Sequence, residues 1–151
     1  DGQVCRHTVQ LRSDGVIDRD GLAALGHVAA SVRRGPGPGD HVLAGGAGFL
    51  LPALATGAVG GILALANIAP GICIDIYRSF SKGDIDNARL LQHKVIPLNN
   101  AVTSKWGVPA LKAAMDHLGL YGGPVRRPLL PVSNDVREQL ISLINEVAAK
   151  V

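Results

Sequence analysis

The chain has 151 residues, of which 47% are hydrophobic and 18% are charged. This composition is too apolar and too weakly charged for a disordered protein, and the length predicts a single domain. The net charge is only +3, and the two adjacent basic pairs, Arg33-Arg34 and Arg126-Arg127, have no aromatic residues interleaved with them. These features argue against a nucleic-acid-binding protein, so no nucleic-acid partner is expected.

Cysteine and histidine residues indicate neither a disulfide framework nor a metal site. Cys5 and Cys73 are the only cysteines and form no CxxC pair, which favours a reducing compartment. The five histidines contain no HxxxH motif, so we expect no metal and no cofactor. The sequence starts at Asp1 and its only methionine is Met115, so we expect a processed or missing N-terminus. A targeting signal is therefore unreadable, and both a cytoplasmic and a mitochondrial location stay open.

The first forty residues offer one predicted element. Residues 1–21 mix charges and glycines without a sustained period. Apolar residues then follow a helical spacing from Leu22 to Val32, which predicts a helix. The Gly- and Pro-rich run Gly35–Gly39 ends it.

The longest uncharged segment runs from His41 to Ile74 and contains no Asp, Glu, Lys or Arg. It is long enough to span a membrane, but seven glycines and two prolines interrupt it. Parallel strands are covered on both faces and therefore also read as continuous apolar runs. We predict a buried β-α-β unit, with strands at His41–Gly45 and Gly60–Asn67 and a short helix at Leu50–Thr56, and we expect no membrane contact.

The second half of the chain is predicted to be helical, because apolar residues recur there at helical spacing. The predicted helices are Ile72–Phe80, Ile85–Ile96, Pro109–Leu118 and Ser133–Ala149. A Gly- and Pro-rich connector, Tyr121–Pro131, separates the last two helices.

Start and stop signals support these helices. Asp84 and Ser133 are expected N-caps, and Asp86 next to Asp84 suits a helix start better than a catalytic carboxylate pair. Pro97 is expected to kink or end its helix. The residues expected to be buried are Ile85, Ala88, Leu91, Val95, Leu111, Ala114, Met115, Leu118, Val136, Leu140, Leu143, Ile144 and Val147.

Few residues suggest chemistry by themselves. The run from Gly45 to Gly48, which reads Gly-Gly-Ala-Gly, follows a predicted strand, where backbone N–H groups can cradle an anion. It lacks the third glycine of a dinucleotide fingerprint, and a tight strand end or a close backbone approach explains it more simply. A lysine nucleophile needs a desolvated site, and no lysine lies in an apolar strand. The lysines are Lys82, Lys94, Lys105, Lys112 and Lys150.

Two segments resemble one enzyme family. Val42–Asn67 reads VLAGGAGFLLPALATGAVGGILALAN, and Val95–Pro131 reads VIPLNNAVTSKWGVPALKAAMDHLGLYGGPVRRPLLP. Together they resemble the C-terminal half of the dihydrodipicolinate synthase / N-acetylneuraminate lyase family, over about residues 41–150. The first segment looks most like the 4-hydroxy-2-oxoglutarate aldolase branch. The other branches usually have acidic residues where this chain has Ala47 and Gly48.

The resemblance implies an α/β fold, the C-terminal part of a (β/α)8 TIM barrel followed by a helical C-terminal extension. About strands 6–8 are implied within residues 1–82, and the extension within residues 83–151. Val42–Gly45 corresponds to strand 7, Gly61–Leu65 to strand 8, and Asp14–Gly21 to a candidate strand 6. A complete barrel takes about 250 residues, so the first five strands are absent from this chain.

The resemblance also implies where substrate binds. Barrel enzymes have their sites at the carboxyl ends of the strands. Gly45 and Ile62 match family positions that approach the pyruvyl part of the substrate. The family's Schiff-base lysine lies on strand 6, where the short alignment puts Ile17, and no lysine precedes Lys82. We therefore assign no catalytic residue and no metal ligand.

These resemblances predict part of an oxo-acid lyase that acts through a Schiff base, with 4-hydroxy-2-oxoglutarate aldolase as the leading activity. Three alternatives remain: a dihydrodipicolinate synthase-type enzyme, a non-catalytic remnant or interaction subunit, and, more remotely, a membrane-anchored protein. This chain by itself is expected to be inactive. Its expected partners are a small oxo acid and further copies of the chain, because family members are commonly tetramers.

Overall fold

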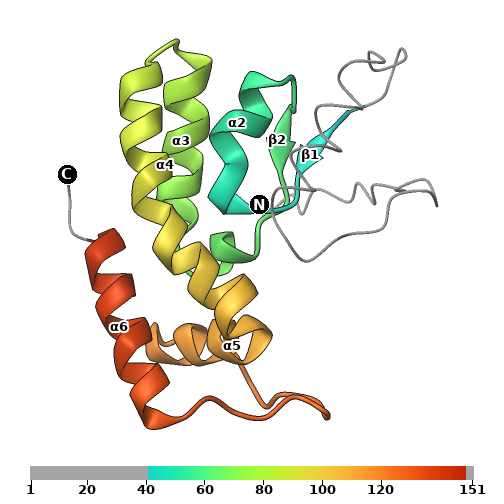
Figure 1. Cartoon of the computed structure of the whole chain (residues 1–151), viewed down its shortest axis with the longest axis vertical. Helices are drawn as coiled ribbons and strands as arrows, with labels where there is room; N and C mark the ends of the chain where they lie inside the picture. The colour runs from blue at the N-terminus through green and yellow to red at the C-terminus, as the bar shows by residue number, and fades with distance from the viewer. Residues whose placement is uncertain (1–40, 149–151) are drawn as a thin grey trace.

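The computed structural model describes residues 41–148 (Figure 1). The helix predicted at Leu22–Val32, its Gly/Pro stop, and the candidate strand Asp14–Gly21 lie outside the described residues. The elements in chain order are β1 (Leu43–Ala44), η1 (Ala47–Phe49), α2 (Leu50–Ala55), β2 (Gly60–Gly61), η2 (Ala64–Asn67), α3 (Pro70–Ser81), α4 (Ile85–Asn100), η3 (Ala101–Lys105), α5 (Gly107–His117) and α6 (Asn134–Ala148).

The β-α-β unit forms where it was predicted. β1 and β2 are parallel, with Leu43 opposite Gly60 and Ala44 opposite Gly61, and α2 connects them. The helix prediction Leu50–Thr56 is confirmed to within one residue at its end. Gly57 follows with a φ of 102°, a conformation that favours glycine and terminates the helix.

The strand lengths were predicted wrongly. The predicted strand His41–Gly45 is reduced to Leu43–Ala44, and the predicted strand Gly60–Asn67 is reduced to Gly60–Gly61. The second half of the latter is the 3-10 turn η2. The N–H of Ala66 donates to the carbonyl of Leu63 at 3.1 Å, and the N–H of Ile68 donates to the carbonyl of Leu65 at 3.0 Å. These local bonds satisfy the backbone within the turn, so the segment leaves the sheet. An apolar run alone does not distinguish the two outcomes.

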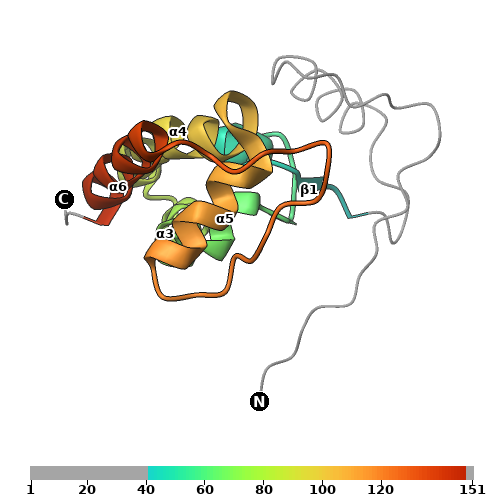
Figure 2. The ribbon, with the colours of Figure 1, turned by 90° about the horizontal axis from the view of Figure 1, so that it is seen from below.

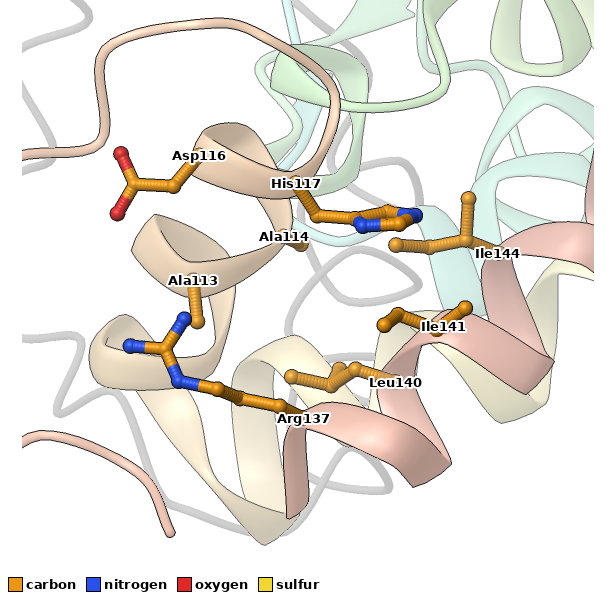
Figure 3. A pocket seen from close by; sticks show the side chains of 8 residues that line it. All are labelled: Ala113, Ala114, Asp116, His117, Arg137, Leu140, Ile141 and Ile144. Atoms are coloured by element: carbon orange, nitrogen blue, oxygen red, sulfur yellow. The ribbon is translucent and has the colours of Figure 1, made fainter. Parts of the chain in front are cut away.

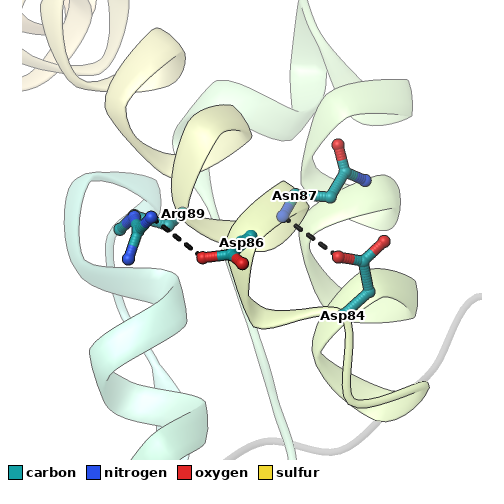
Figure 4. Close-up of polar contacts among 4 residues, drawn as sticks. All are labelled: Asp84, Asp86, Asn87 and Arg89. Carbon is teal, nitrogen blue, oxygen red and sulfur yellow. Dashed lines mark hydrogen bonds and ion pairs between the residues drawn. The ribbon is translucent and has the colours of Figure 1, made fainter.

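α3 and α4 form an antiparallel helical hairpin (Figure 1). Between them, Gly83 has a φ of 78°, which an L side chain rarely adopts. The Asp84 side chain accepts a hydrogen bond from the backbone N–H of Asn87 at 3.1 Å, so the predicted N-cap is confirmed (Figure 4). The helix predicted at Ile72–Phe80 is confirmed. The observed helix, α3, is longer and runs from Pro70 to Ser81.

Pro97 does not end its helix. α4 continues through it to Asn100, and the π-helical turn η3 follows directly. Proline has no N–H to donate to the preceding turn, so one helical hydrogen bond is missing there. Burial of the flanking residues Val95, Leu98 and Val102 explains why the helix continues despite that loss.

α5 packs against α6, and both form as predicted (Figure 2). The Ser133 hydroxyl accepts a hydrogen bond from the N–H of Val136 at 3.4 Å, in agreement with its predicted role as the cap. Leu140 and Ile144 are buried as predicted. The connector between α5 and α6 loops outward before it returns to start α6, without regular helix or strand (Figure 2).

Two predicted core positions are exposed instead. Leu118 is 41% exposed and Ile85 is 47% exposed, and Met115 is only partly buried. On α5 the buried stripe consists of the alanines at 110, 113 and 114 rather than the larger apolar residues. Small side chains let two helices approach closely, which turns the larger residues toward the edge of the contact.

One hydrophobic core runs through the described residues. It joins Ala44 and Leu65 near the strands to Val95 on α4 and Leu140 on α6. Among residues 41–148, no helix is long and apolar enough to cross a membrane.

Candidate functional site

The two residues predicted to bind substrate lie together at one edge of the sheet. Gly45 directly follows β1 and Ile62 directly follows β2, at the carboxyl ends of paired parallel strands. The N–H of Ile62 donates to the carbonyl of Ala44 at 2.9 Å, which fixes the end of β2 beside the end of β1. A substrate that reached one residue would therefore also reach the other.

Both positions are open. A Cβ atom built on Gly45 meets nothing within 4 Å, and the side chain of Ile62 is 63% exposed. Gly61 differs, because a Cβ there would lie 3.0 Å from the carbonyl oxygen of Ala44. The sheet edge thus combines one tightly packed glycine with two accessible positions.

The turn after Gly45 is closely packed on α4. A Cβ on Gly46 would lie 2.8 Å from the ring of Phe49, and one on Gly48 would lie 2.9 Å from Nδ2 of Asn99. The close backbone approach that the glycine run suggested is therefore present. These contacts account for Gly46 and Gly48 without an anion.

A buried amide that the sequence analysis did not single out holds this turn. Nε2 of Gln92 donates to the carbonyl of Ala47 at 2.8 Å, and Oε1 accepts from the N–H of Leu51 at 2.8 Å. Gln92 is 6% exposed and Asn99 is 7% exposed. A signal was available, because both amides lie on the same face of α4 as Ala88 and Val95. A polar residue on a buried stripe needs partners, and here the partners are backbone groups of the turn.

No described lysine lies on a strand or in the turn that follows Gly45. Lys82 follows α3, and Lys94 lies on α4. Lys105 stacks over the ring of Trp106 at 4.1 Å, and Nζ of Lys112 donates to the carbonyl of Gly122. The described chain therefore offers no lysine at the carboxyl edge of the sheet.

The two neighbouring carboxylates at the start of α4 and the buried Cys73 have structural surroundings. Asp84 caps α4, and Asp86 forms an ion pair with Arg89 at 2.9 Å, so the two carboxylates act separately (Figure 4). Burial raises the pKa of the Cys73 thiol, which keeps it protonated and unreactive. Within residues 41–148, no group of three or more His, Cys, Asp or Glu side chains could hold a metal ion.

A second candidate site is a surface pocket of about 220 Å³ between α5 and α6 (Figure 3). Its floor contains Leu140 and Ile144, and Asp116, His117 and Arg137 stand at its rim. In Figure 3 the carboxylate of Asp116 points away from the floor. It accepts a hydrogen bond from the N–H of Gly122 at 2.8 Å. The rim therefore has one carboxylate that the connector already uses and no arrangement of a nucleophile with a base.

Comparison with known proteins identifies the family. The sequence profile of the dihydrodipicolinate synthetase family matches residues 24–147. The 4-hydroxy-tetrahydrodipicolinate synthase of Methanopyrus kandleri is 36% identical over 104 residues, which cover 68% of this chain and 35% of that protein. The enzyme of the same name from Archaeoglobus fulgidus is 36% identical over 111 residues, covering 70% of this chain and 38% of the relative. The chain thus spans little more than a third of the length of these relatives.

Solved structures agree with this match. A Thermus thermophilus protein provisionally described as a dihydrodipicolinate synthase superposes with a TM-score of 0.74 at 36% identity, covering 82% of this chain and 42% of that one. The 4-hydroxy-tetrahydrodipicolinate synthase of Methylacidiphilum fumariolicum gives a TM-score of 0.73 at 26% identity, covering 82% and 41%. Both the sequence and the α/β fold lead to one conclusion: the chain belongs to the dihydrodipicolinate synthetase family.

Proposed function

We propose that the chain is the C-terminal part of a (β/α)8 barrel together with the helical extension that follows it. In this proposal β1 and β2 are strands 7 and 8, residues 1–82 belong to the barrel, and residues 83–151 form the extension. The parallel pair, its connecting helix and the partial coverage of the relatives support this assignment. Parallel strands are normally covered on both faces, which two short strands alone cannot achieve.

The proposed activity is cleavage or formation of a carbon–carbon bond in an oxo acid through a Schiff base. A lysine amine adds to the substrate carbonyl and water leaves, and the resulting iminium accepts the electron pair of the bond that breaks. Gly45 and Ile62 are proposed to contact the pyruvyl part of that substrate. The observation that carries this proposal is the pair of open positions at the carboxyl ends of adjacent parallel strands.

Two substrates remain candidates, and a specific observation favours each. The absence of acidic residues at Ala47 and Gly48 favours 4-hydroxy-2-oxoglutarate. Ala47 is fully buried and Gly48 packs against Asn99, so the turn has no room for acidic side chains. The names of the relatives instead favour 4-hydroxy-tetrahydrodipicolinate synthesis. We propose the first as the leading activity and keep the second as its alternative.

The nucleophile must come from elsewhere, because no lysine precedes Lys82 and none of the described lysines lies at the sheet edge. We propose that this chain contributes the substrate-facing edge, and that strands carrying the lysine complete the site. Without those strands the chain is a non-catalytic subunit, which is the third alternative.

Borohydride trapping tests the proposal. Borohydride delivers hydride to an imine and makes the adduct permanent, so mass spectrometry of tryptic peptides locates it. We expect no adduct when the chain alone is treated with pyruvate. We expect an adduct on the complementing lysine when the chain is co-expressed with the N-terminal part of the Thermus thermophilus relative. A single adduct on a lysine of this chain, accompanied by turnover, contradicts the proposed division of roles.

A matched pair of variants tests the substrate edge itself. Gly45→Val puts its Cβ atom into open space, so we expect the variant to keep the fold and to block the substrate. Gly71→Ala also adds atoms in open space, but at the start of α3, and is the control. We expect trapping in the complemented assembly to be lost in Gly45→Val and retained in Gly71→Ala. Equal trapping in both variants rules out Gly45 as a substrate contact.

A further inference from the structure

Gln92 connects the helical part of the molecule to the turn that carries Gly45. Its side chain bonds to a backbone group at the start of η1, the carbonyl of Ala47, and to one in the first turn of α2, the N–H of Leu51. The two bonds span sequence separations of 45 and 41 residues, so they are tertiary contacts. An amide can make this bridge because it carries a donor and an acceptor on one rigid plane.

Asn99 contacts the same turn two helical turns later. Gln92 and Asn99 are seven residues apart, which puts them on one face of α4. Nδ2 of Asn99 lies against the Cα of Gly48, so closely that a Cβ on Gly48 would be 2.9 Å away. Oδ1 of Asn99 is buried and has no hydrogen-bond partner. Of the two amides, Gln92 therefore makes the directional contacts, and Asn99 limits how far the turn can approach α4.

The bridge constrains the substrate edge by its position. Ala47 lies two residues after Gly45, and Leu51 lies in the first turn of α2. Because Gln92 bonds to both residues, it fixes the path of the chain from the end of β1 into α2. Losing the bridge would leave the half-buried N–H of Leu51 without its partner, and the carbonyl of the buried Ala47 would keep only its bond from the N–H of Leu50, which favours rearrangement of the turn.

We propose that Gln92 is a positioning residue that sets the conformation of the turn from Gly45 to Phe49, and thereby the geometry with which Gly45 meets the substrate. The proposal rests on the proposed role of Gly45 as a substrate contact. It makes α4, which lies in the proposed helical extension, part of the support of the site. Gln92 does not touch substrate and is not a catalytic residue.

The variant Gln92→Glu distinguishes a hydrogen-bonding role of Gln92 from a purely space-filling one. A protonated glutamic acid has the same shape and both functions, because its carbonyl oxygen accepts from Leu51 and its hydroxyl donates to Ala47. The ionised carboxylate only accepts, and it faces the carbonyl oxygen of Ala47 with a negative charge. The variant should therefore keep the native turn at low pH and lose it at high pH.

Nuclear magnetic resonance of the chain provides the first measurement. In Gln92→Glu, we expect the backbone amide signals of Gly45, Gly48 and Leu51 to match the wild type near the acid end of a titration and to move away as the pH rises. η1 and α2 contain no ionisable side chain, and a parallel titration of the wild type removes the contribution of all other groups. Gln92→Leu should show the altered signals at every pH. Signals that match the wild type throughout in both variants overturn the proposal.

Val95→Ala is the stability control. Val95 is fully buried on α4 and lies one turn beyond Gln92, so its truncation weakens the core without removing either bond. We expect a lower melting temperature with unchanged signals for Gly45 and Gly48. If Val95→Ala shifts these signals as much as Gln92→Leu does, the turn responds to any weakening of the core. The proposed positioning role of Gln92 is then wrong.

Pyruvate trapping in the complemented assembly links the turn to substrate. At neutral pH, Gln92→Glu should raise the pyruvate concentration for half-maximal trapping about tenfold relative to the wild type, as expected for one lost hydrogen bond. That ratio should approach one at low pH. A ratio of one at every pH overturns the proposal while the proposed function stands. Absence of trapping in the wild-type assembly overturns the proposed function instead, and that failure is visible without any variant.

Discussion

The strand-bearing part of the chain is residues 41–69, and the helical part is residues 70–148. The two parts differ in how their backbone N–H and C=O groups find hydrogen-bond partners. Side chains cap the starts of α4 and α6, and the helices carry apolar stripes that bury residues such as Val95 and Leu140. The sheet of the described residues has only two strands of two residues each. An α-helix completes its hydrogen bonds within itself, whereas a strand depends on neighbours. The same chain therefore forms complete helices and a minimal sheet.

Exposed apolar side chains occur in both parts of the chain. Val59, directly before β2, is 48% exposed, and Ile62, directly after β2, is 63% exposed, although both lie in an uncharged run that predicts burial. Such residues at strand ends are expected to be covered by further strands. In the helical part the apolar stripes are covered by neighbouring helices, and α4 contacts both α3 and α6. Because exposed apolar residues such as Leu90 and Tyr121 occur in the helical part as well, the claim that this part is closer to self-sufficient rests on its backbone hydrogen bonds and its buried stripes.

The largest expected effect tests that claim in the helical part. Leu140 is 1% exposed, so Leu140→Ala should reduce the free energy of unfolding by about 2–5 kcal/mol. Leu90 on α4 is 56% exposed, and Leu90→Ala should change the free energy by no more than about 0.5 kcal/mol. Urea denaturation followed by circular dichroism measures both. Equal effects would mean that the α6 stripe faces water.

A smaller loss is expected at the connector that closes α5. A Cβ on Gly122 would overlap the backbone carbonyl of Lys112, so Gly122→Ala must shift backbone and should cost about 1–3 kcal/mol. Gly71 at the start of α3 has open space, and Gly71→Ala should be neutral or stabilise by up to about 1 kcal/mol. Thermal melts compare the two variants. A Gly122→Ala variant as stable as the wild type contradicts the close packing of the connector on α5.

The cap of α4 should contribute less again. Asp84→Ala removes the acceptor for the N–H of Asn87 and should cost about 0.5–2 kcal/mol. Asp84→Asn keeps a capping oxygen and should retain most of that stability. Denaturant melts distinguish a cap from a general charge effect. If asparagine is as costly as alanine, the hydrogen bond in Figure 4 is not the source of the stability.

The smallest effect on stability, and a visible effect on association, is expected at the sheet edge. We expect the chain by itself to self-associate, because strand edges and apolar residues there lack a cover. Ile62→Ser should reduce this association and change the free energy of unfolding by no more than about 0.5 kcal/mol. Sedimentation velocity measures the association. Leu90→Ser is the matched control, and an equal reduction in both variants would place the association surface elsewhere.

The sequence predicted helices better than strands, for reasons that individual residues show. Asp84 and Ser133 are local signals, since each cap bonds a backbone N–H three residues along the chain. Pro97 is also a local signal; of its two predicted effects, the helix end does not occur, because burial on both sides continues the helix. The segment Gly60–Asn67 failed as a strand because apolar composition fits a buried turn as well as a buried strand.

The candidate site was predictable only in part. Gly45 and Ile62 were selected through resemblance, and they lie together because their strands are adjacent and parallel. Their role in binding substrate remains a prediction. Gln92 was not selected, although it lies on the same helical face as Ala88 and Val95, because the sequence does not show which backbone groups the amide would bond. Its contacts to Ala47 and Leu51 cross more than forty positions of sequence.

The sequence by itself determined the local elements: the β-α-β order, the caps, the glycine stops and the apolar stripe of α6. These depend on interactions within a few residues, which a single chain segment already contains. Only the tertiary structure decided which face of α5 is buried, how far β2 extends, and which polar side chain supports the turn after Gly45. Each of these depends on packing between elements distant in sequence, and the free energy of that packing overrides the local preference of any one segment.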